Sequence, residues 1–443
     1  MRTKFAIWVI FVWLTSFGHY HIHAQVIRFQ RLGKEAGYSQ NTINCIYQDH
    51  NGLLWMGTQD GLNKYDGYQF EIFRHHKEDS TSLSHSWIWD IAEDRYQQLW
   101  VATWQGLNKM DTISGKFIRF LPQSKNLSGK IGSRPTSLAN DERGFLWISF
   151  WGAGLCRYDH EKNHFQDFRA NNTSEGLPSD FVRKLYIDRN NQLWICTWDG
   201  LARLEYRNNE PQIAKVALRK DDTDLNNIKI TCAADYGNSN LWLGTLENGI
   251  ISLNTETGET EQFLHDATKP KSLKSNDISA LYLDSRNKMW VGTTADGLHI
   301  YNEQIKGFDG FEHNEGDEQT ISGNYVASIF EDNSGIIWIG ANGINKYNPR
   351  QLRFSHFKHH PRDRHSLSNN RVTAFCEDHK GNIWIGTDGS LDYFNPANKT
   401  FKNIFQDNER SISLSDNNLT SIILDKNDRL LIGTGGGGLN VLT

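Results

Sequence analysis

The chain has 443 residues, a formal net charge of −5 and a hydrophobic fraction of 38%, with 15 tryptophans and 23 phenylalanines. This length and composition allow more than one domain with a sizeable core, and the acidic balance argues against a nucleic-acid-binding surface. The five cysteines are an odd number and fall in separate predicted strands, so we interpret them as small buried residues rather than disulfides or metal ligands.

The first 24 residues have the pattern of an export signal. A charged start at Arg2 precedes an apolar run from Phe5 to about Phe17, which is too short to span a bilayer comfortably. The segment ends at Ala24. We therefore predict a signal peptide over 1–24 and export of the mature chain to the periplasm.

Nine copies of one short pattern fill the rest of the chain. Its tryptophan recurs at intervals of 45 to 48 residues, and Leu431 takes the ninth place. A period of about 40–50 residues built from short strands is typical of a β-propeller, in which each repeat forms one blade. The repeated tryptophans are Trp55, Trp100, Trp147, Trp194, Trp242, Trp290, Trp338 and Trp384.

Each repeat divides into four predicted strands. In the first repeat these begin near Ile43, Leu54, Gly61 and Phe70, and Asp49 opens the tight turn between the first two. Alternating side chains of such strands pack face to face, and tryptophan and phenylalanine fill the wedge between neighbouring blades.

An extra outer strand precedes the first complete repeat. Residues 26–32 carry the fourth-strand pattern, with Phe29 and Leu32, before any first strand. Such a strand completes the last blade of a ring and removes its open edge, so we predict that it pairs near 345–347 of the seventh repeat. Residues 352–357 have a similar pattern and are predicted to play the same part for a second ring.

These features predict an all-β fold. A seven-bladed β-propeller is expected over 25–349, followed at 350–443 by the first two blades of a second, incomplete propeller. One nine-bladed ring also balances the strand count and stays open as the alternative. The partner of the Phe29 strand distinguishes the two, because a nine-bladed ring places that strand against the ninth repeat.

The repeats resemble the two-component regulator propeller. The motif is clearest at 370–378 and 381–387, and the opening at 37–67 resembles the first blade of the periplasmic sensor half of Bacteroidetes hybrid histidine kinases. In that family two seven-bladed propellers sense glycan fragments, and an Ig-like domain, a membrane helix and a kinase follow; these later parts are missing from the sequence. The resemblance implies a ligand-binding sensor part that works with a histidine kinase module in cis or in trans. A homodimer and full-length relatives anchored in the inner membrane also fit it.

Positions that differ among repeats are the candidates for ligand contact, because positions that pack must stay alike. The first slot lies 13 residues before the tryptophan, at the mouth of the innermost strand, and in repeats two to seven it holds Trp87, Arg134, Phe181, Lys229, Asp277 and Tyr325. The second slot lies four residues after the tryptophan and in repeats two to four it holds Trp104, Trp151 and Trp198. Both loops share one face of a propeller, so we expect the two slots to converge there.

The chemistry of these slots suits an oligosaccharide. Aromatic faces match the C–H surfaces of sugars, and Arg134 and Lys229 suit carboxylate or sulfate groups. The alternative is that the three second-slot tryptophans only fill gaps between blades. The same repeats lack the usual glycine after the motif tryptophan and have Ala102, Ser149 and Cys196 instead.

No catalytic motif, cofactor site or metal site is predicted. The glycine run at 433–438 lacks the Lys-Ser or Lys-Thr of a phosphate loop, and the adjacent histidines at 75–76 and 359–360 point apart in an extended chain. Asp277 is the only carboxylate of the first slot in repeats one to seven, whereas glycoside chemistry needs a pair. A propeller glycosidase or lyase is therefore the least favoured class, behind a protein-interaction platform without a small ligand.

Overall fold

The computed structural model describes residues 27–121, 134–350, 357–405 and 413–443, except 172, 174, 221, 222, 238, 362 and 399. The predicted signal segment 1–24 lies outside these residues, as does 352–356 of the predicted second closing strand. The chain divides into two compact units, Met1–Pro349 and Arg350–Thr443. Within the described part, no helix has the length and apolar character needed to cross a membrane.

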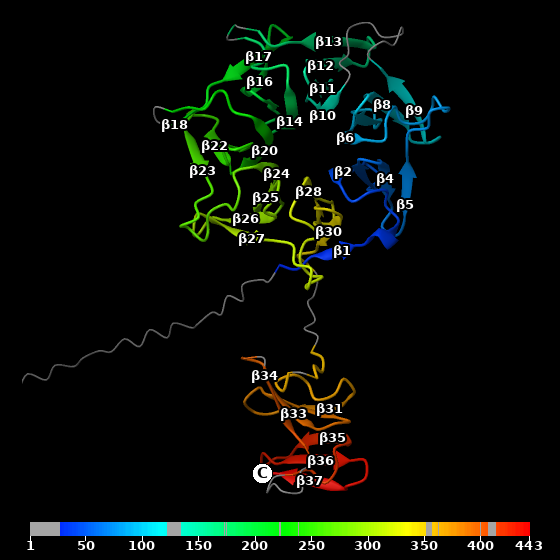
Figure 1. Ribbon diagram of the computed structural model, residues 1–443, viewed down its shortest axis with the longest axis vertical. Coiled ribbons are helices and arrows are strands. Elements are labelled where there is room, and N and C mark those ends of the chain that lie inside the picture. Colours follow the sequence, from blue (N-terminus) through cyan, green and yellow to red (C-terminus); the bar gives the residue numbers. More distant parts are fainter. Residues whose placement is uncertain are drawn as a thin grey trace, which may run out of the picture. The chain divides into compact units, whose positions relative to one another are not determined.

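The described residues form antiparallel sheets, which confirms the all-β prediction (Figure 1). Sheets are numbered here by their repeat. Sheets 1 to 3 comprise β2 (Ile43–Gln48), β3 (Leu54–Thr58), β4 (Gly61–Tyr65) and β5 (Phe70–Phe73); β6 (Ile88–Glu93), β7 (Leu99–Thr103), β8 (Gly106–Asp111) and β9 (Lys116–Phe120); β10 (Pro135–Asn140), β11 (Leu146–Phe150), β12 (Gly154–Asp159) and β13 (His164–Phe168). Sheets 4 to 6 comprise β14 (Val182–Ile187), β15 (Leu193–Thr197), β16 (Gly200–Arg207) and β17 (Glu210–Val216); β20 (Ile230–Tyr236), β21 (Asn240–Thr245), β22 (Ile250–Asn254) and β23 (Thr260–Phe263); β24 (Ile278–Leu283), β25 (Met289–Thr293), β26 (Leu298–Asn302) and β27 (Gly307–Phe311).

The remaining sheets depart from this order. Sheet 7 combines β28 (Ser328–Glu331), β29 (Ile337–Gly340) and β30 (Ile344–Tyr347) with β1 (Gln30–Leu32) from the start of the chain. In the second unit, sheet 8 comprises β31 (Val372–Glu377), β32 (Ile383–Thr387), β33 (Leu391–Asn395) and β34 (Thr400–Ile404), and sheet 9 comprises β35 (Leu419–Leu424), β36 (Leu430–Thr434) and β37 (Leu439–Leu442). A 3-10 turn, η1 (Lys34–Ala36), follows β1, and a two-stranded hairpin, β18 (Arg219–Lys220) with β19 (Thr223–Asp224), lies between sheets 4 and 5.

The first strands of sheets 1 to 7 surround the centre of the first unit (Figure 1). Each contacts the next in the order β2, β6, β10, β14, β20, β24 and β28, and β28 contacts β2 again. Sheet 7 is also hydrogen-bonded to sheet 1. The Ser328 hydroxyl donates to the carbonyl of Ile43 at 2.8 Å, and the Asn333 N–H donates to Oε1 of Gln48 at 2.8 Å.

The closing strand occupies its predicted place. β1 pairs antiparallel with β30, with Gln30 opposite Lys346. Phe29, just before it, is buried, and its ring centroid lies 6.2 Å from that of Tyr347. The prediction that this segment pairs near 345–347 is therefore confirmed. The described β1 pairs with the seventh repeat and not with the ninth.

A buried carboxylate fixes both the tight turn and the tryptophan of most repeats. In sheet 1, Oδ1 of Asp49 accepts the backbone N–H groups of Asn51 and Leu53, while Oδ2 accepts the indole N–H of Trp55 at 2.8 Å. One side chain thus closes the turn and satisfies a buried donor. The same indole bond, 2.7–2.9 Å long, joins Asp94 to Trp100, Asp141 to Trp147, Asp188 to Trp194, Asp284 to Trp290 and Asp332 to Trp338.

A hydrogen bond between an asparagine and a serine side chain ties the third strand of a sheet to the loop before its first strand. In sheet 1, the Asn63 amide donates to the Ser39 hydroxyl at 2.8 Å, and sheets 2, 7 and 9 repeat this serine–asparagine pair. In sheet 6 the corresponding residues are Lys274 and His299. His299 is fully buried, and neither ring nitrogen has a hydrogen-bond partner in the described part of the chain. Burial, and then the nearby charge of Lys274, lowers the pKa of His299 to about 4.

Because His299 is buried in its neutral form, we expect the protein to lose stability in acid. Folded His299 stays neutral down to about pH 4, whereas in the unfolded chain it binds a proton near pH 6.5. The free energy of unfolding should therefore fall as the pH drops below about 6.5, by about 3 kcal/mol at pH 4. Urea unfolding of the wild type and of Lys274→Ser/His299→Asn, which restores the serine–asparagine pair, should show the smaller pH dependence in the variant. Equal pH dependence in the two proteins would contradict this role of His299.

Candidate functional site

The two variable slots lie side by side, as expected from the sequence. In five repeats the backbone N–H of the second-slot residue donates to the carbonyl of the first-slot residue, at 2.9–3.1 Å. The pairs are Trp104 to Trp87, Trp151 to Arg134, Trp198 to Phe181, Leu246 to Lys229 and Thr294 to Asp277. These bonds place the loops that precede the first strands beside the loops that join the second and third strands, at the mouth of the ring.

Three tryptophans of sheet 2 form one aromatic group at this mouth, here called the tryptophan cluster: Trp87, Trp89 and Trp104. Their ring centroids lie 5.3–6.0 Å apart, and all three side chains are half-buried. The guanidinium carbon of Arg134 lies 4.6 Å from the Trp104 ring, and that of Arg183 lies 5.2 Å from the Trp89 ring. The cluster is therefore flanked by two cations from sheets 3 and 4.

Sheets 3 to 5 contribute a second group, made of Trp151, Phe181, Trp198 and Lys229. Trp151 and Trp198 meet edge to face at 4.5 Å, and Phe181 lies 5.4 Å from Trp151. The Lys229 ammonium lies 5.4 Å from the Trp198 ring. The close contact between the two tryptophans uses part of their surface for packing, in the manner of the gap-filling alternative, while Phe181 stays exposed.

Asp277 and Tyr325 belong to neither group. Oδ1 of Asp277 accepts the backbone N–H of Glu247 at 2.7 Å, so this carboxylate supports a loop of the neighbouring sheet. Tyr325 is exposed, and it makes no ring contact with the residues that the structure describes. Of the nine residues predicted from the two slots, six belong to the two aromatic groups, and Arg134 flanks the first of them.

Comparison of the two slots missed Trp89 and Arg183. Both occupy the bulged position of a first strand, where the register of sheets 1 to 6 shifts by one residue. In the four other sheets this position holds a short polar residue that donates to a carbonyl of the next sheet at 2.6–2.7 Å: Asn44 to Ile88, Thr136 to Val182, Thr231 to Ile278 and Ser279 to Val326. A third slot, two residues after the first, would have identified these two exceptions.

Asp90 and Lys184, which directly follow Trp89 and Arg183 in the sequence, also contact each other. Lys184 Nζ lies 3.0 Å from Oδ2 of Asp90, and the same oxygen accepts the Ser137 hydroxyl at 2.7 Å and the Leu138 N–H at 3.0 Å. The pair joins sheet 4 to sheet 2 past sheet 3. Asp90 is buried and Lys184 is partly exposed, so this cation is neutralised by a well-bonded carboxylate.

The cysteines and histidine pairs have structural settings. Four cysteines are buried and Cys376 is half-buried, with no disulfide among them. Burial raises the pKa of Cys232 to about 11, which disfavours a reactive thiolate. The histidines at 75 and 359 use Nδ1 to contact the carbonyls of Leu83 and Leu367 at 2.7 and 2.8 Å. Within the described ranges no group of three or more His, Cys, Asp or Glu residues is placed to hold a metal ion.

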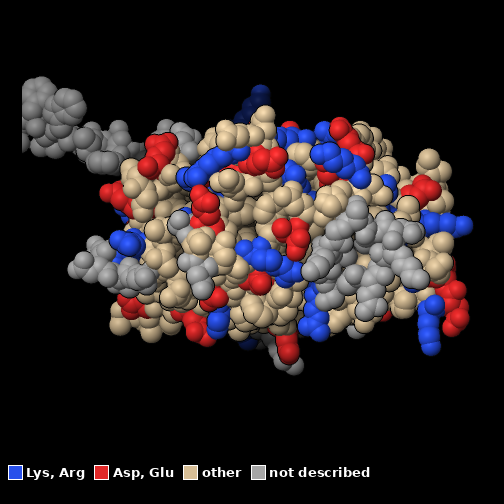
Figure 2. All heavy atoms as spheres, turned by 90° about the horizontal axis from the view of Figure 1, so that it is seen from above, with Lys and Arg blue, Asp and Glu red and all other residues tan. Residues whose placement is uncertain are grey.

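Charge over the outer side of the ring is mixed. In the view of Figure 2, acidic and basic side chains alternate without an extended area of one sign. Many of them pair with each other, as Lys271 does with Asp309 and Arg74 with Asp60. The cations of the two aromatic groups are unlike these pairs, because each lies over an aromatic ring and forms no ion pair among the described residues.

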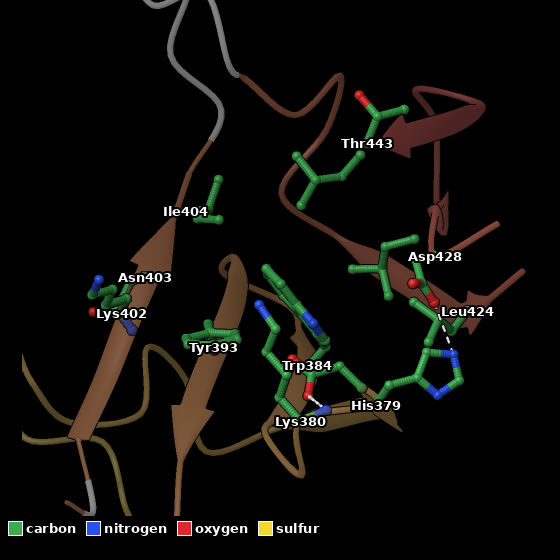
Figure 3. A pocket seen from close by; sticks show the side chains of 13 residues that line it. His379, Lys380, Trp384, Tyr393, Lys402, Asn403, Ile404, Leu424, Asp428 and Thr443 are labelled. Atoms are coloured by element: carbon green, nitrogen blue, oxygen red, sulfur yellow. Dashed lines mark hydrogen bonds and ion pairs between the residues drawn. The ribbon is translucent and has the colours of Figure 1, made fainter. Parts of the chain in front are cut away.

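A pocket of about 710 Å³ lies within the second unit, and none of the predicted site residues lines it (Figure 3). It opens between β34 and β37, and Trp384, Tyr393 and Ile404 form part of its wall. In the first unit a phenylalanine from the fourth strand of the next sheet fills this kind of gap, as Phe117 does 5.9 Å from Phe73. Sheet 9 has three strands among the described residues, so we interpret the pocket as a packing gap.

Comparison with known proteins relates the repeats to a family. Six segments match the profile of the family described as Two component regulator propeller: 37–60, 82–105, 176–199, 272–295, 320–343 and 366–389. A stretch of 48 residues is 56% identical to a protein named Histidine kinase P4 of Formosa agariphila, and it covers 11% of this chain and 4% of that protein.

Solved structures share the fold. The extracellular domain of a protein described as a hybrid two component system of B. thetaiotaomicron is 24% identical, with a TM-score of 0.68 over 94% of this chain and 53% of that one. A second extracellular domain from the same organism is 21% identical, with a TM-score of 0.60 over 94% of this chain and 58% of that one. Virginiamycin B lyase from Staphylococcus aureus is 12% identical, with a TM-score of 0.52 over 72% of this chain and 99% of that one. The chain thus spans little more than half the length of these two extracellular domains.

Proposed function

Since the chain carries two-component regulator propeller repeats, we propose that it is a periplasmic sensor part that binds an oligosaccharide and signals through a histidine kinase module in cis or in trans. The observation that carries the proposal is the tryptophan cluster with Arg134 and Arg183 beside it. Aromatic faces bind the C–H surfaces of sugars, and guanidinium groups bind their polar or charged substituents.

The indole N–H groups support the same function. Six motif tryptophans donate to a buried aspartate, for example Trp100 to Asp94 at 2.7 Å. The members of the tryptophan cluster donate to no acceptor within the described residues, and their half-buried rings line the ring mouth. Nε1 of Trp87 is buried and has no hydrogen-bond partner among the described residues, and an unpaired indole donor beside half-buried ring faces suits a hydroxyl-rich ligand.

For the architecture, we propose that 25–349 form a seven-bladed propeller and that 350–443 are the first two blades of a second, incomplete one. Two exposed apolar side chains of the second unit support this architecture. Phe375 is 75% exposed, whereas Ile91 at the matching position of sheet 2 is 4% exposed. Leu439 is 68% exposed, whereas Leu62 in sheet 1 is 0% exposed. These side chains have the character of residues that another blade covers.

The proposed site predicts the behaviour of Arg134→Ala. In calorimetric titrations of the purified chain with an oligosaccharide panel, this variant should lose about ten- to hundredfold in affinity, because a charge-assisted contact is worth about 1.5–3 kcal/mol. Its melting temperature should stay unchanged, since Arg134 is exposed. Absence of binding to any oligosaccharide would contradict the proposed function and favour a protein-interaction platform, and cleavage of the sugar during titration would favour a glycosidase or lyase.

A further inference from the structure

The two arginines beside the tryptophan cluster define the charge of the ligand. We propose that the ring mouth is specific for an acidic oligosaccharide, whose carboxylate or sulfate group is bound by Arg134 and Arg183 while a sugar ring lies on the tryptophan cluster. This inference rests on the proposed function and adds the class of sugar to it.

Two arginines and two tryptophans form one row, in the order cation, ring, ring and cation. Along the row, Arg134 lies 4.6 Å from the Trp104 ring, Trp104 lies 6.0 Å from Trp89, and Arg183 lies 5.2 Å from Trp89. Stacking on an aromatic ring fixes the plane of each guanidinium but leaves the donors on its edge available. An anionic group at the edge of a sugar can therefore meet a guanidinium while the apolar face of that sugar lies on the neighbouring indole.

Neither guanidinium has a carboxylate partner in the described part of the chain. Lys229, beside the second aromatic group, is in the same situation. The nearby Lys184 is different, because Asp90 neutralises it at 3.0 Å. Since unpaired cations around one opening raise the local concentration of anions, the mouth favours a negatively charged ligand over a neutral one of the same shape.

The bulged position argues against a purely structural role for Arg183. The same position holds Thr136 in sheet 3 and Thr231 in sheet 5, and each hydroxyl donates to the next sheet. A bulge redirects one side chain out of the regular sheet, and bulges are common beside functional sites. At this position sheets 2 and 4 have Trp89 and Arg183 instead of a short polar residue. These two side chains contact each other although they lie 94 positions apart in the sequence.

The variant Arg183→Thr tests the inference, because threonine is the residue that sheets 3 and 5 have at this position, where its hydroxyl donates to the next sheet. Calorimetry would use oligogalacturonate, oligoalginate and sulfated galactan fragments, with their carboxyl-reduced or desulfated forms as neutral counterparts. We expect wild type to prefer the acidic probes, and this preference to weaken at high salt. Arg183→Thr should lose about ten- to hundredfold in affinity for the acidic probe and keep its affinity for the neutral one, at an unchanged melting temperature.

Lys109→Gln is the matched control. Lys109 also lies over a tryptophan of sheet 2, 5.8 Å from the ring of Trp100, but that ring belongs to the core. This variant should bind every probe as the wild type does. Equal affinity for acidic and neutral probes, or unchanged affinity in Arg183→Thr, would overturn the acidic specificity and leave the proposed function standing. Absence of binding to both kinds of probe would contradict the proposed function as well, and the stronger of the uronate and sulfate probes identifies the anionic group.

Discussion

Replacing Trp290 with alanine should lower the free energy of unfolding by about 3–5 kcal/mol, the range for removing a large buried aromatic side chain. Trp290 is fully buried in sheet 6, and its ring centroid lies 5.5 Å from that of Tyr347 in sheet 7. Its indole N–H donates to the buried Asp284 at 2.9 Å. The substitution leaves a cavity between two sheets and removes one hydrogen bond from a buried carboxylate, and both effects are destabilising. Urea unfolding followed by circular dichroism measures the loss.

The variant Trp104→Ala serves as the comparison, because it removes a tryptophan from the ring mouth and not from the core. Trp104 is half-buried at the ring mouth, and its ring contacts are to Trp87, Trp89 and Arg134. Its removal should cost clearly less stability than that of Trp290, because a half-buried ring leaves no closed cavity. An equal loss for both variants would mean that Trp104 acts as a core residue, and its place in the binding site would be wrong.

Deleting residues 26–32 should destabilise the whole first unit. The deletion removes β1 from sheet 7 and leaves the edge of β30 without a partner, which is a template for aggregation. It also removes the buried ring of Phe29. The guanidinium of Arg31 adds hydrogen bonds to the carbonyls of Thr320 at 2.8 Å and Asp317 at 2.9 Å, so the strand is anchored by side chains as well as backbone.

Thermal unfolding and size-exclusion chromatography together measure the effect of this deletion. We expect a lower unfolding midpoint and larger species in solution. Arg31→Lys is the control, because it keeps the strand and the charge but loses the fork of donors, and it should have a smaller effect. A deleted chain that stays monomeric with the wild-type midpoint would contradict the closing role of β1.

Much of the fold could be predicted because every repeat buries the same positions. The spacing of the motif tryptophans, such as Trp55 and Trp100, fixes the repeat length, and a fourth-strand pattern ahead of the first complete repeat identifies Phe29 as part of a closing strand. The aspartate of the turn was expected from its sequence position. Its bond to the tryptophan indole depends on the packed geometry of two strands, and it was found only in the structure.

The site could be predicted only in part. Variation between repeats singled out Trp87, Trp104 and Arg134 for the proposed site, because positions that share a packing role in every repeat stay alike. Trp89 and Arg183 escaped this comparison because they lie on a bulge, where side-chain direction departs from strict alternation. Their contact also depends on the curvature of the ring, which brings sheets 2 and 4 within reach of each other, and no single repeat contains that information.

The most direct test of the account is a crystal structure of the chain with the tightest-binding oligosaccharide of the panel. We expect density for the sugar at the ring mouth, against Trp104 and Trp89 and within hydrogen-bond reach of Arg134 and Arg183. Sugar density confined to the pocket between β34 and β37, or to the outer side of the ring, would contradict the central claim that the mouth of the first unit is the ligand-binding site.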